Sequence, residues 1–436
     1  MCDLTCVHKD KRIWWLVVVL LVFFNFAVWQ RMLIADWLGL HAARFASMDR
    51  VSVSEKLIQL AHVFDRESSS AMVASARIQR RKGNLLGFGR DLRRAESLGA
   101  LPKEIQLERA LAIAESGQMG TARPLLLELL ETAGGNESEI CESYAKGYMR
   151  LRDYNAALGL LEAWARDFPK DARAHAWTGQ VYSELDLVDE AEGAFRRALE
   201  LDPLNGQASL GLAELRMGQK NPIAAMPLFE VAANTERFGA AGSVGLASCL
   251  QAGSRVGQAE EVLRDALARF PDDYRVLVEA ANLLNEQGEY AEAESLLQKE
   301  IALGSNRREV RYAYAVALRG LGRIDEARLH FDYSAEAATQ TAQANRRAAD
   351  LASRPNDAQL RFEIGNIHLL YGNIEDGLIW LHSALEISPD LSEAHESLAR
   401  HYESQISRDP RLIPLARKHR LLASAANPSS PKGPVD

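Results

Sequence analysis

Cysteine is scarce in this chain of 436 residues, which contains only four. Cys2 and Cys6 lie close to the N-terminus, whereas Cys141 and Cys249 are far apart in the sequence. No two of them form a Cys-x-x-Cys pair, the spacing that is typical of zinc modules and redox-active thiols. The pattern argues against both kinds of chemistry. It predicts that Cys141 and Cys249 are buried structural thiols with no disulfide between them.

Motifs of catalysis are missing as well. The chain has no Gly-x-Ser-x-Gly elbow, no His-Glu-x-x-His pair, no Walker loop and no Gly-x-Gly-x-x-Gly nucleotide loop. Five histidines gather near the C-terminus: His368, His382, His395, His401 and His419. His395 and His401 are six residues apart and so face different sides of a helix, whereas metal ligation needs two or three ligands on one side. We therefore predict a protein that is not an enzyme and holds no metal and no cofactor.

Positive charge is not in excess. Lys and Arg number 51 against 59 Asp and Glu, a formal net charge of −8, which argues against a general nucleic-acid binder. One segment, residues 77–94, departs from this balance. Its cations are Arg77, Arg80, Arg81, Lys82, Arg90, Arg93 and Arg94. They form either an ordinary solvated helix face or a patch that contacts anionic lipid, an acidic partner or nucleic acid.

An apolar run stands near the N-terminus. Residues 13–29 contain one polar residue, Asn25, and as a helix they would span about 25 Å, the short end of what a bilayer core requires. Residues 32–34 extend the run. We predict a transmembrane anchor at residues 13–34, with its end tryptophans in the headgroup zone: Trp14, Trp15 and Trp29.

A cleaved signal peptide is the alternative to this anchor. Signal peptides have a shorter apolar run and a small-x-small cleavage site, but here Gln30, Arg31 and Met32 follow the run. Basic residues cluster within residues 9–12, just before the span. This bias predicts a single-pass membrane protein with a cytoplasmic N-terminus and the rest of the chain on the opposite side.

Alanine recurs every 34 residues in the middle of the chain, at Ala157, Ala191, Ala225, Ala259, Ala293 and Ala327. Aromatic and helix-ending residues keep the same register, for example Tyr182, Phe195 and Pro203 around Ala191. This period and these positions resemble those of tetratricopeptide repeat (TPR) proteins. The resemblance implies that each repeat is a pair of antiparallel helices and that the six alanines lie where two helices cross closely.

The resemblance covers residues 69–424, with one slip of 16 residues in register between Ala327 and Gly365. It implies an all-α solenoid, a right-handed superhelix of about nine to ten repeats without β-sheet. Residues 325–354 lack proline and glycine, which favours one long inserted helix there. Before the solenoid we expect a short tail at residues 1–12, the anchor, and a helical segment at residues 35–68 that could be a degenerate first repeat. We expect a disordered tail at residues 425–436.

In TPR proteins, fixed positions of each first helix line a concave groove. These positions correspond here to Leu210, Met217, Val244, Val278, Asn282, Tyr312, Val316, Phe362 and Asn366. The set is mainly apolar; Asn282 would pair with the backbone of a bound peptide and Tyr312 would supply stacking area. The Lys–Asn grip of chaperone-tail clamps is absent, since Val278 precedes Asn282 and Phe362 precedes Asn366. The alternative is that these residues simply pack against neighbouring helices.

The sequence therefore favours a membrane-anchored TPR scaffold that binds protein partners, either peptide segments or other membrane-associated proteins, through its groove. An assembly or maturation factor for a cell-envelope or membrane-enzyme complex fits the same features. A regulator that contacts nucleic acid or anionic lipid through residues 77–94 is a more remote alternative, and binding of nucleic acid is not expected.

Overall fold

The computed structural model describes residues 30–46, 50–132, 134–351 and 353–426. Across these described residues every regular element is a helix and no strand is present, so the all-helical prediction is confirmed. The chain divides into two compact units, residues 1–112 and residues 113–436. Each unit is described by itself.

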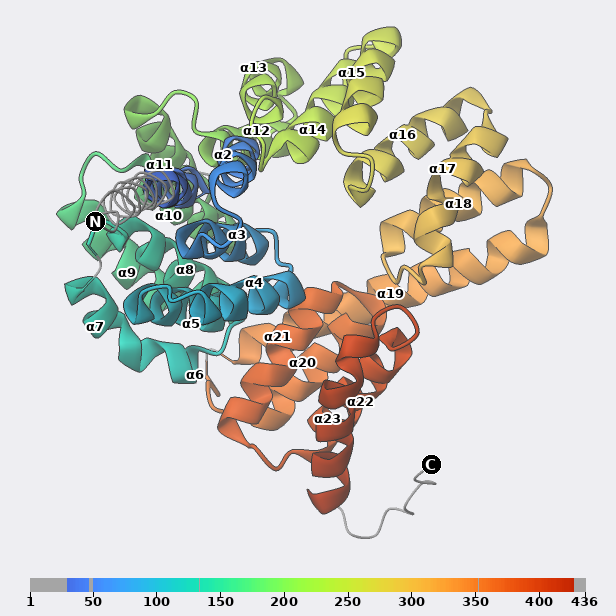
Figure 1. The fold of residues 1–436 in the computed structure, drawn as a ribbon. Coiled ribbons are helices and arrows are strands. Elements are labelled where there is room, and N and C mark those ends of the chain that lie inside the picture. The colour runs from blue at the N-terminus through green and yellow to red at the C-terminus, as the bar shows by residue number, and fades with distance from the viewer. Residues whose placement is uncertain (1–29, 47–49, 133, 352, 427–436) are drawn as a thin grey trace, which may run out of the picture. The chain divides into compact units, whose positions relative to one another are not determined.

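Unit 1 holds a helix at residues 30–46 and the helices that follow it (Figure 1). Their bounds are α2 Val51–Phe64, α3 Ser69–Arg81, α4 Leu85–Ser97 and α5 Pro102–Glu115. The last of these crosses into unit 2. The core of unit 1 lies between α3, α4 and α5, where Phe88 and Leu92 pack with Ile105.

The predicted anchor at residues 13–34 falls mostly outside the described residues. Trp14, Trp15 and Trp29 belong to residues 1–29, which the structure does not describe. No helix in the described ranges is long and apolar enough to cross a bilayer. The anchor therefore stays a prediction.

The basic segment at residues 77–94 is not arranged as either interpretation of the sequence predicts. Arg77 and Arg80 are buried, and their Nε atoms lie 2.6 and 3.0 Å from the two carboxylate oxygens of Glu108, which is itself fully buried. Burial alone would raise the pKa of Glu108, but the two guanidinium groups hold it below its ordinary value. These two arginines are structural ion-pair partners inside unit 1, so they lie neither on a solvated face nor in a surface patch.

Other cations of the segment also find acids nearby. Lys82 pairs with Glu55 at 2.6 Å and Arg94 with Glu67 at 3.2 Å. The nearest acid in sequence, Asp91, accepts from Arg90. Most cations of the segment are therefore paired with acids of unit 1, which weakens the proposal that it binds lipid or nucleic acid.

Unit 2 consists of successive helices that pair in sequence order (Figure 1). Their bounds are α6 Met119–Ala122, the 3-10 helix η1 Arg123–Leu125, α7 Leu126–Glu131, α8 Glu137–Arg150, α9 Tyr154–Asp167, α10 Ala172–Glu184, α11 Val188–Leu201, α12 Gly206–Gly218, α13 Pro222–Ala233, α14 Gly239–Ala252, α15 Val256–Arg269, α16 Tyr274–Gln287, α17 Tyr290–Ala302, α18 Arg308–Gly320, α19 Ile324–Asp350, α20 Ala358–Tyr371, α21 Ile374–Ile387, α22 Ser392–Gln405, η2 Pro410–Leu412 and α23 Ile413–Ala426.

A left-handed residue ends the first helix of each regular pair. These residues are 34 positions apart and have φ between 55° and 81°: Arg152, Asp186, Lys220, Ser254, Gly288 and Gly322. One residue later the second helix begins, and in two of the six turns the side chain of that residue caps it; Asn221, for example, accepts from the backbone N–H of Ala224 at 3.1 Å. The turn thus repeats with the same period as the alanines, although only two of its six left-handed residues are glycine.

Small residues create the helix crossings. The six period-34 alanines are buried, with exposed fractions between 0% and 2%. Around Ala191, the ring of Phe195 fills the space between α10 and α12, because a Cβ atom on Gly179 or Gly211 would lie within 2.6 Å of that ring. Close packing of this kind leaves no room for larger side chains.

The register slip coincides with α19. This helix has 27 residues, against 13 or 14 in α16, α17 and α18. Near its start Ala327 packs in the core with α16, α17 and α18, and near its end Ala344 and Ala348 pack with Leu360 and Ile364 of α20. One helix therefore completes one pair and begins the packing of the next.

Unit 2 also makes contacts between segments far apart in the chain. The carboxylate of Glu386 on α21 accepts from the backbone N–H groups of Gly120 and Thr121, at 3.2 and 3.1 Å, across 266 and 265 residues. Arg152 donates to the side-chain oxygen of Asn345 on α19 at 2.9 Å. The first helices of unit 2 are therefore held against helices near its end, which a series of neighbour contacts alone would not produce.

Three histidines form a buried cluster between α21, α22 and α23. The Nδ1 atoms of His395 and His419 are 2.9 Å apart, and Nε2 of His395 lies 2.9 Å from the carbonyl oxygen of Pro389. The Nε2–H of His395 donates to that carbonyl, and the two Nδ1 atoms share one hydrogen bond. Burial lowers the pKa of His382 and of His419 to about 4.

Candidate functional site

An apolar groove lies between α16, α18 and α19. It has a volume of about 610 Å³. Val278 and Asn282 of α16, Tyr312 of α18, and Phe331 and Ala335 of α19 line it. Its lining is mostly hydrophobic, and its volume falls in the range typical of ligand sites, about 300–1,000 Å³.

Two aromatic rings form one wall of the apolar groove. Tyr312 and Phe331 meet edge to face with ring centroids 5.4 Å apart, and the guanidinium of Arg319 lies 5.3 Å from the Phe331 ring. Phe331 is half-buried by these contacts, whereas Tyr312 is 54% exposed. A ring fixed on one side and open on the other offers apolar area to a ligand.

Asn282 is the main polar side chain on the floor of the groove. It makes no side-chain hydrogen bond within the described part of the chain, and it is half-buried. Arg308 and Glu309 stand at the rim and are exposed. The groove thus combines apolar walls, a free amide and one charge of each sign.

The other residues predicted for the concave groove lie elsewhere. Met217 contacts the sulfur of Cys249 at 3.4 Å, and Val244 packs against the cluster of Ala240, Ala266 and Val276. Val316 is half-buried. Phe362 packs on the core of α21 and α22, and Asn366 accepts from Ser397 at 3.0 Å. All of these side chains are half-buried, so their place in one continuous groove stays a prediction.

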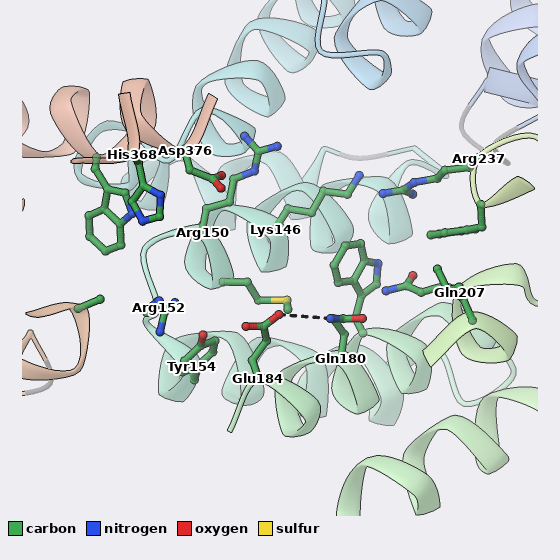
Figure 2. A pocket seen from close by; sticks show the side chains of 16 residues that line it. Lys146, Arg150, Arg152, Tyr154, Gln180, Glu184, Gln207, Arg237, His368 and Asp376 are labelled. Carbon is green, nitrogen blue, oxygen red and sulfur yellow. Dashed lines mark hydrogen bonds between the residues drawn. The ribbon is translucent and has the colours of Figure 1, made fainter. Parts of the chain in front are cut away.

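Leu210 lines a second cavity, which we call the charged pocket; it has a volume of about 410 Å³. Six ionised side chains line it: Lys146, Arg150, Arg152, Arg237, Glu184 and Asp376. Figure 2 shows Lys146 and Arg237 reaching toward each other on one side, and Arg150, His368 and Asp376 on the other. Four cations thus face two acids.

A buried carboxylate, that of Glu142, forms ion pairs with two of these cations. Glu142, which is 1% exposed, accepts from Lys146 at 2.8 Å and from Arg237 at 3.0 Å through the same oxygen. The indole ring of Trp177 lies between them, 5.7 Å from Nζ of Lys146 and 5.9 Å from Cζ of Arg237. These contacts fix the position of both cations before any ligand arrives.

The opposite side of the charged pocket owes its position to the long-range contacts of unit 2. Arg152 is the left-handed turn residue after α8 and is tied to Asn345 of α19. His368 and Asp376 come from α20 and α21. Burial lowers the pKa of His368, so the ring is neutral near pH 7. Glu142 and Glu115 balance Lys146 and Arg237, so Arg150 and Arg152 are the cations of the pocket that lack an ion pair in the part of the chain that the structure describes.

Sequence reasoning missed most residues of both cavities. Phe331 lies four residues after Ala327, as Phe195 lies four after Ala191, so its place in the repeat is visible in the sequence. The charged pocket had no such signal, because Arg150 and Asp376 are more than six repeats apart and become neighbours only in three dimensions.

Comparison with protein-family models identifies part of unit 2. Models described as tetratricopeptide repeat match residues 145–203, 184–241 and 250–302. These segments are tetratricopeptide repeats. The matches cover the regular helix pairs from α8 to α17, where the alanine period and the left-handed turns coincide, so the TPR prediction is confirmed there.

Curated relatives share shorter stretches. The chain is 28% identical over 164 residues to cellulose synthase 1 operon protein C of Komagataeibacter xylinus, covering 36% of this chain and 12% of that protein. It is 30% identical over 118 residues to cellulose synthase operon protein C of Komagataeibacter sucrofermentans, covering 26% of this chain and 9% of that protein. The chain therefore spans about a tenth of the length of the curated relatives it matches.

Solved TPR structures resemble the chain weakly. The Cut9–Hcn1 tetramer of the APC/C matches with a TM-score of 0.46 at 17% identity, covering 77% of this chain and 63% of that one. PilW, described as a type IV pilus biogenesis factor, matches with a TM-score of 0.39 at 21% identity, covering 51% and 96%. Likeness at this level carries no functional argument.

Proposed function

We propose that this protein is a non-catalytic TPR scaffold that binds a peptide segment of a partner protein in the apolar groove of α16, α18 and α19. The observation that carries the proposal is the groove itself. Val278, Asn282 and Tyr312, chosen from their repeat positions, lie together there and are joined by Phe331.

The lining indicates the chemistry of the occupant. Apolar side chains from the partner would bury against Val278, Phe331 and the exposed ring of Tyr312. The unpaired amide of Asn282 can both donate to and accept from a peptide backbone. An occupant with apolar side chains and backbone amides is a short extended or helical polypeptide segment.

We further propose that residues 13–34 tether this scaffold to a membrane, with the N-terminus cytoplasmic and the repeats on the opposite side. The length and composition of that segment support this. A tether raises the effective concentration of the groove for partners in the same membrane, so modest intrinsic affinity suffices. An assembly or maturation factor would use the same arrangement.

The test is to select peptides that bind the purified full-length chain from a random library and then to measure the affinity of the selected peptides. We expect selected peptides to carry two or three apolar side chains and to lose affinity about tenfold or more in a Tyr312→Ala, Asn282→Ala double variant. Circular dichroism should show that the double variant keeps its helical content.

A matched control is Leu329→Ala, which removes another exposed side chain from α19 (71% exposed) outside the groove. This variant should bind the selected peptides as the unchanged chain does. Equal losses in both variants, or none in the double variant, would show that the partner does not use this groove.

A further inference from the structure

We propose that the charged pocket is a second, separate binding site, which takes an acidic segment of a polypeptide. It differs from the apolar groove in the helices that form it and in the number of charged side chains that line it. Its walls come from α8, α10 and α12 together with α19, α20 and α21, and charged and amide side chains make up eight of its 16 lining residues.

Two arginines make the pocket able to receive an anion. Arg150 has no ion-pair partner among the residues that the structure describes, and Arg152 is bonded only to the neutral amide of Asn345. Both are exposed. A guanidinium presents several N–H donors in a plane that matches a carboxylate, so each can bind one acidic side chain without first breaking an ion pair.

Lys146 and Arg237 are already paired on the other side of the pocket. Glu142 accepts from both, and Glu115 lies 3.6 Å from Lys146. Two carboxylates therefore balance these two cations. The cationic point open to a further carboxylate is Arg150 with Arg152.

The other lining residues favour a polypeptide over a polyphosphate. Glu184 and Asp376 lie between and beside the cations, and they would repel a continuous chain of phosphates. A peptide can place separated carboxylates on the cations and avoid both acids. Gln207 and Gln180, which is weakly bonded to Glu184 at 3.4 Å, supply amides for a peptide backbone.

The experiment measures binding of labelled hexaglutamate to the purified full-length chain by fluorescence anisotropy, with tripolyphosphate as competitor. We expect Arg150→Gln to weaken binding by about tenfold, since a charge-assisted hydrogen bond is lost. We expect Asp376→Asn to strengthen binding severalfold, because it removes a repulsive charge. Raising the salt concentration should weaken binding in every variant.

The matched control is Arg264→Gln, which removes an exposed arginine on α15, outside both cavities. It should leave hexaglutamate affinity unchanged. An equal loss in this control, or weaker binding in Asp376→Asn, would overturn the proposal. Tripolyphosphate that binds tightly while hexaglutamate does not would also overturn it and would assign the pocket to phosphate.

The two proposals are distinguishable within one set of variants. Tyr312→Ala with Asn282→Ala should leave hexaglutamate binding intact, and Arg150→Gln should leave binding of the selected apolar peptides intact. Gain of affinity in Asp376→Asn cannot come from a folding defect, so the charged pocket stays testable if the arginine variants are unstable.

Discussion

The two cavities of unit 2 are built in different ways. The apolar groove takes its residues from α16, α18 and α19, which follow one another closely in the chain, whereas the charged pocket joins α8, α10 and α12 to helices about two hundred residues later. The groove depends on the packing of adjacent repeats. The pocket depends in addition on contacts such as Glu386 with Gly120 and Thr121. A repeat protein can thus hold one site that is local and another that exists only when distant repeats meet.

Lowering the pH should produce the largest difference between ligand binding in the charged pocket and in the apolar groove. Burial, together with the nearby Lys418 and His395, lowers the pKa of His382 and of His419 from 6.5 to about 4. The unfolded chain therefore binds protons first, so stability is complete above pH 6.5 and is lost as pH falls from 6.5 to 4. Each group contributes at most about 1.4 kcal/mol per pH unit. Because α21 lies on this cluster and also lines the charged pocket, hexaglutamate binding should fail before binding in the groove.

Thermal unfolding at pH 7.5, 6 and 5, followed with both ligands, measures this effect. In a His382→Asn, His419→Asn double variant the melting temperature should depend less on pH. If the unchanged chain and the double variant have the same slope, the histidine cluster does not control the stability of α21 to α23.

A larger side chain at a helix crossing should have the second-largest effect on the stability of the chain and on binding in the two cavities. Ala191 is fully buried among Phe195, Ala176 and Ala208, so Ala191→Leu should destabilise the chain by about 1–3 kcal/mol. The helices it would separate, α10 and α12, carry Trp177 and Leu210 into the charged pocket. Binding of hexaglutamate should therefore weaken more than binding of apolar peptides.

The melting temperature and the two affinities check that prediction. Ala342→Leu places the same side chain at an exposed position of α19, where it should cost little. A melting temperature for Ala191→Leu equal to that of this control would show that Ala191 does not lie at a tight crossing.

The smallest effect concerns two glycines and should have opposite signs. Gly288 is a left-handed turn residue with φ 81°, so Gly288→Ala should destabilise by about 1 kcal/mol. Gly193 lies inside α11 with open space around it, so Gly193→Ala should stabilise by a similar amount, about 0.5–1 kcal/mol. Differential scanning calorimetry resolves both shifts. Two changes of the same sign would contradict the turn geometry that sets the helix pairs.

The sequence predicted the helix pairs within each repeat. It predicted few of the contacts between distant repeats. The period of the alanines gave the helix pairs, because residues 34 apart occupy equivalent positions. It also selected Val278, Asn282 and Tyr312, which share a groove because consecutive first helices lie side by side. Whether they bind a partner stays a prediction.

The partners that the sequence did not indicate have a common physical origin. Asn366 was predicted to line the groove, and in the structure Ser397 of a later repeat donates to its amide oxygen. Arg77 and Arg80 were interpreted as part of a locally basic segment, whereas Glu108, 31 and 28 residues away, forms an ion pair with each of them. In each case the decisive partner lies about one repeat further along the chain. The charged pocket requires the path of the whole array, which no local pattern contains.

The contact between Glu386 and α6 also determines the order in which the two cavities form during synthesis of the chain. A chain is synthesised from its N-terminus, and each helix pair of a repeat array can fold as it emerges. The apolar groove is complete once α19 has been made, before α20 and α21 exist. The charged pocket must wait for α21 and then for a closure across 266 residues, a slow step because its sequence separation is large. A nascent chain therefore forms the apolar groove first, and the charged pocket only after nearly all of the protein has been synthesised.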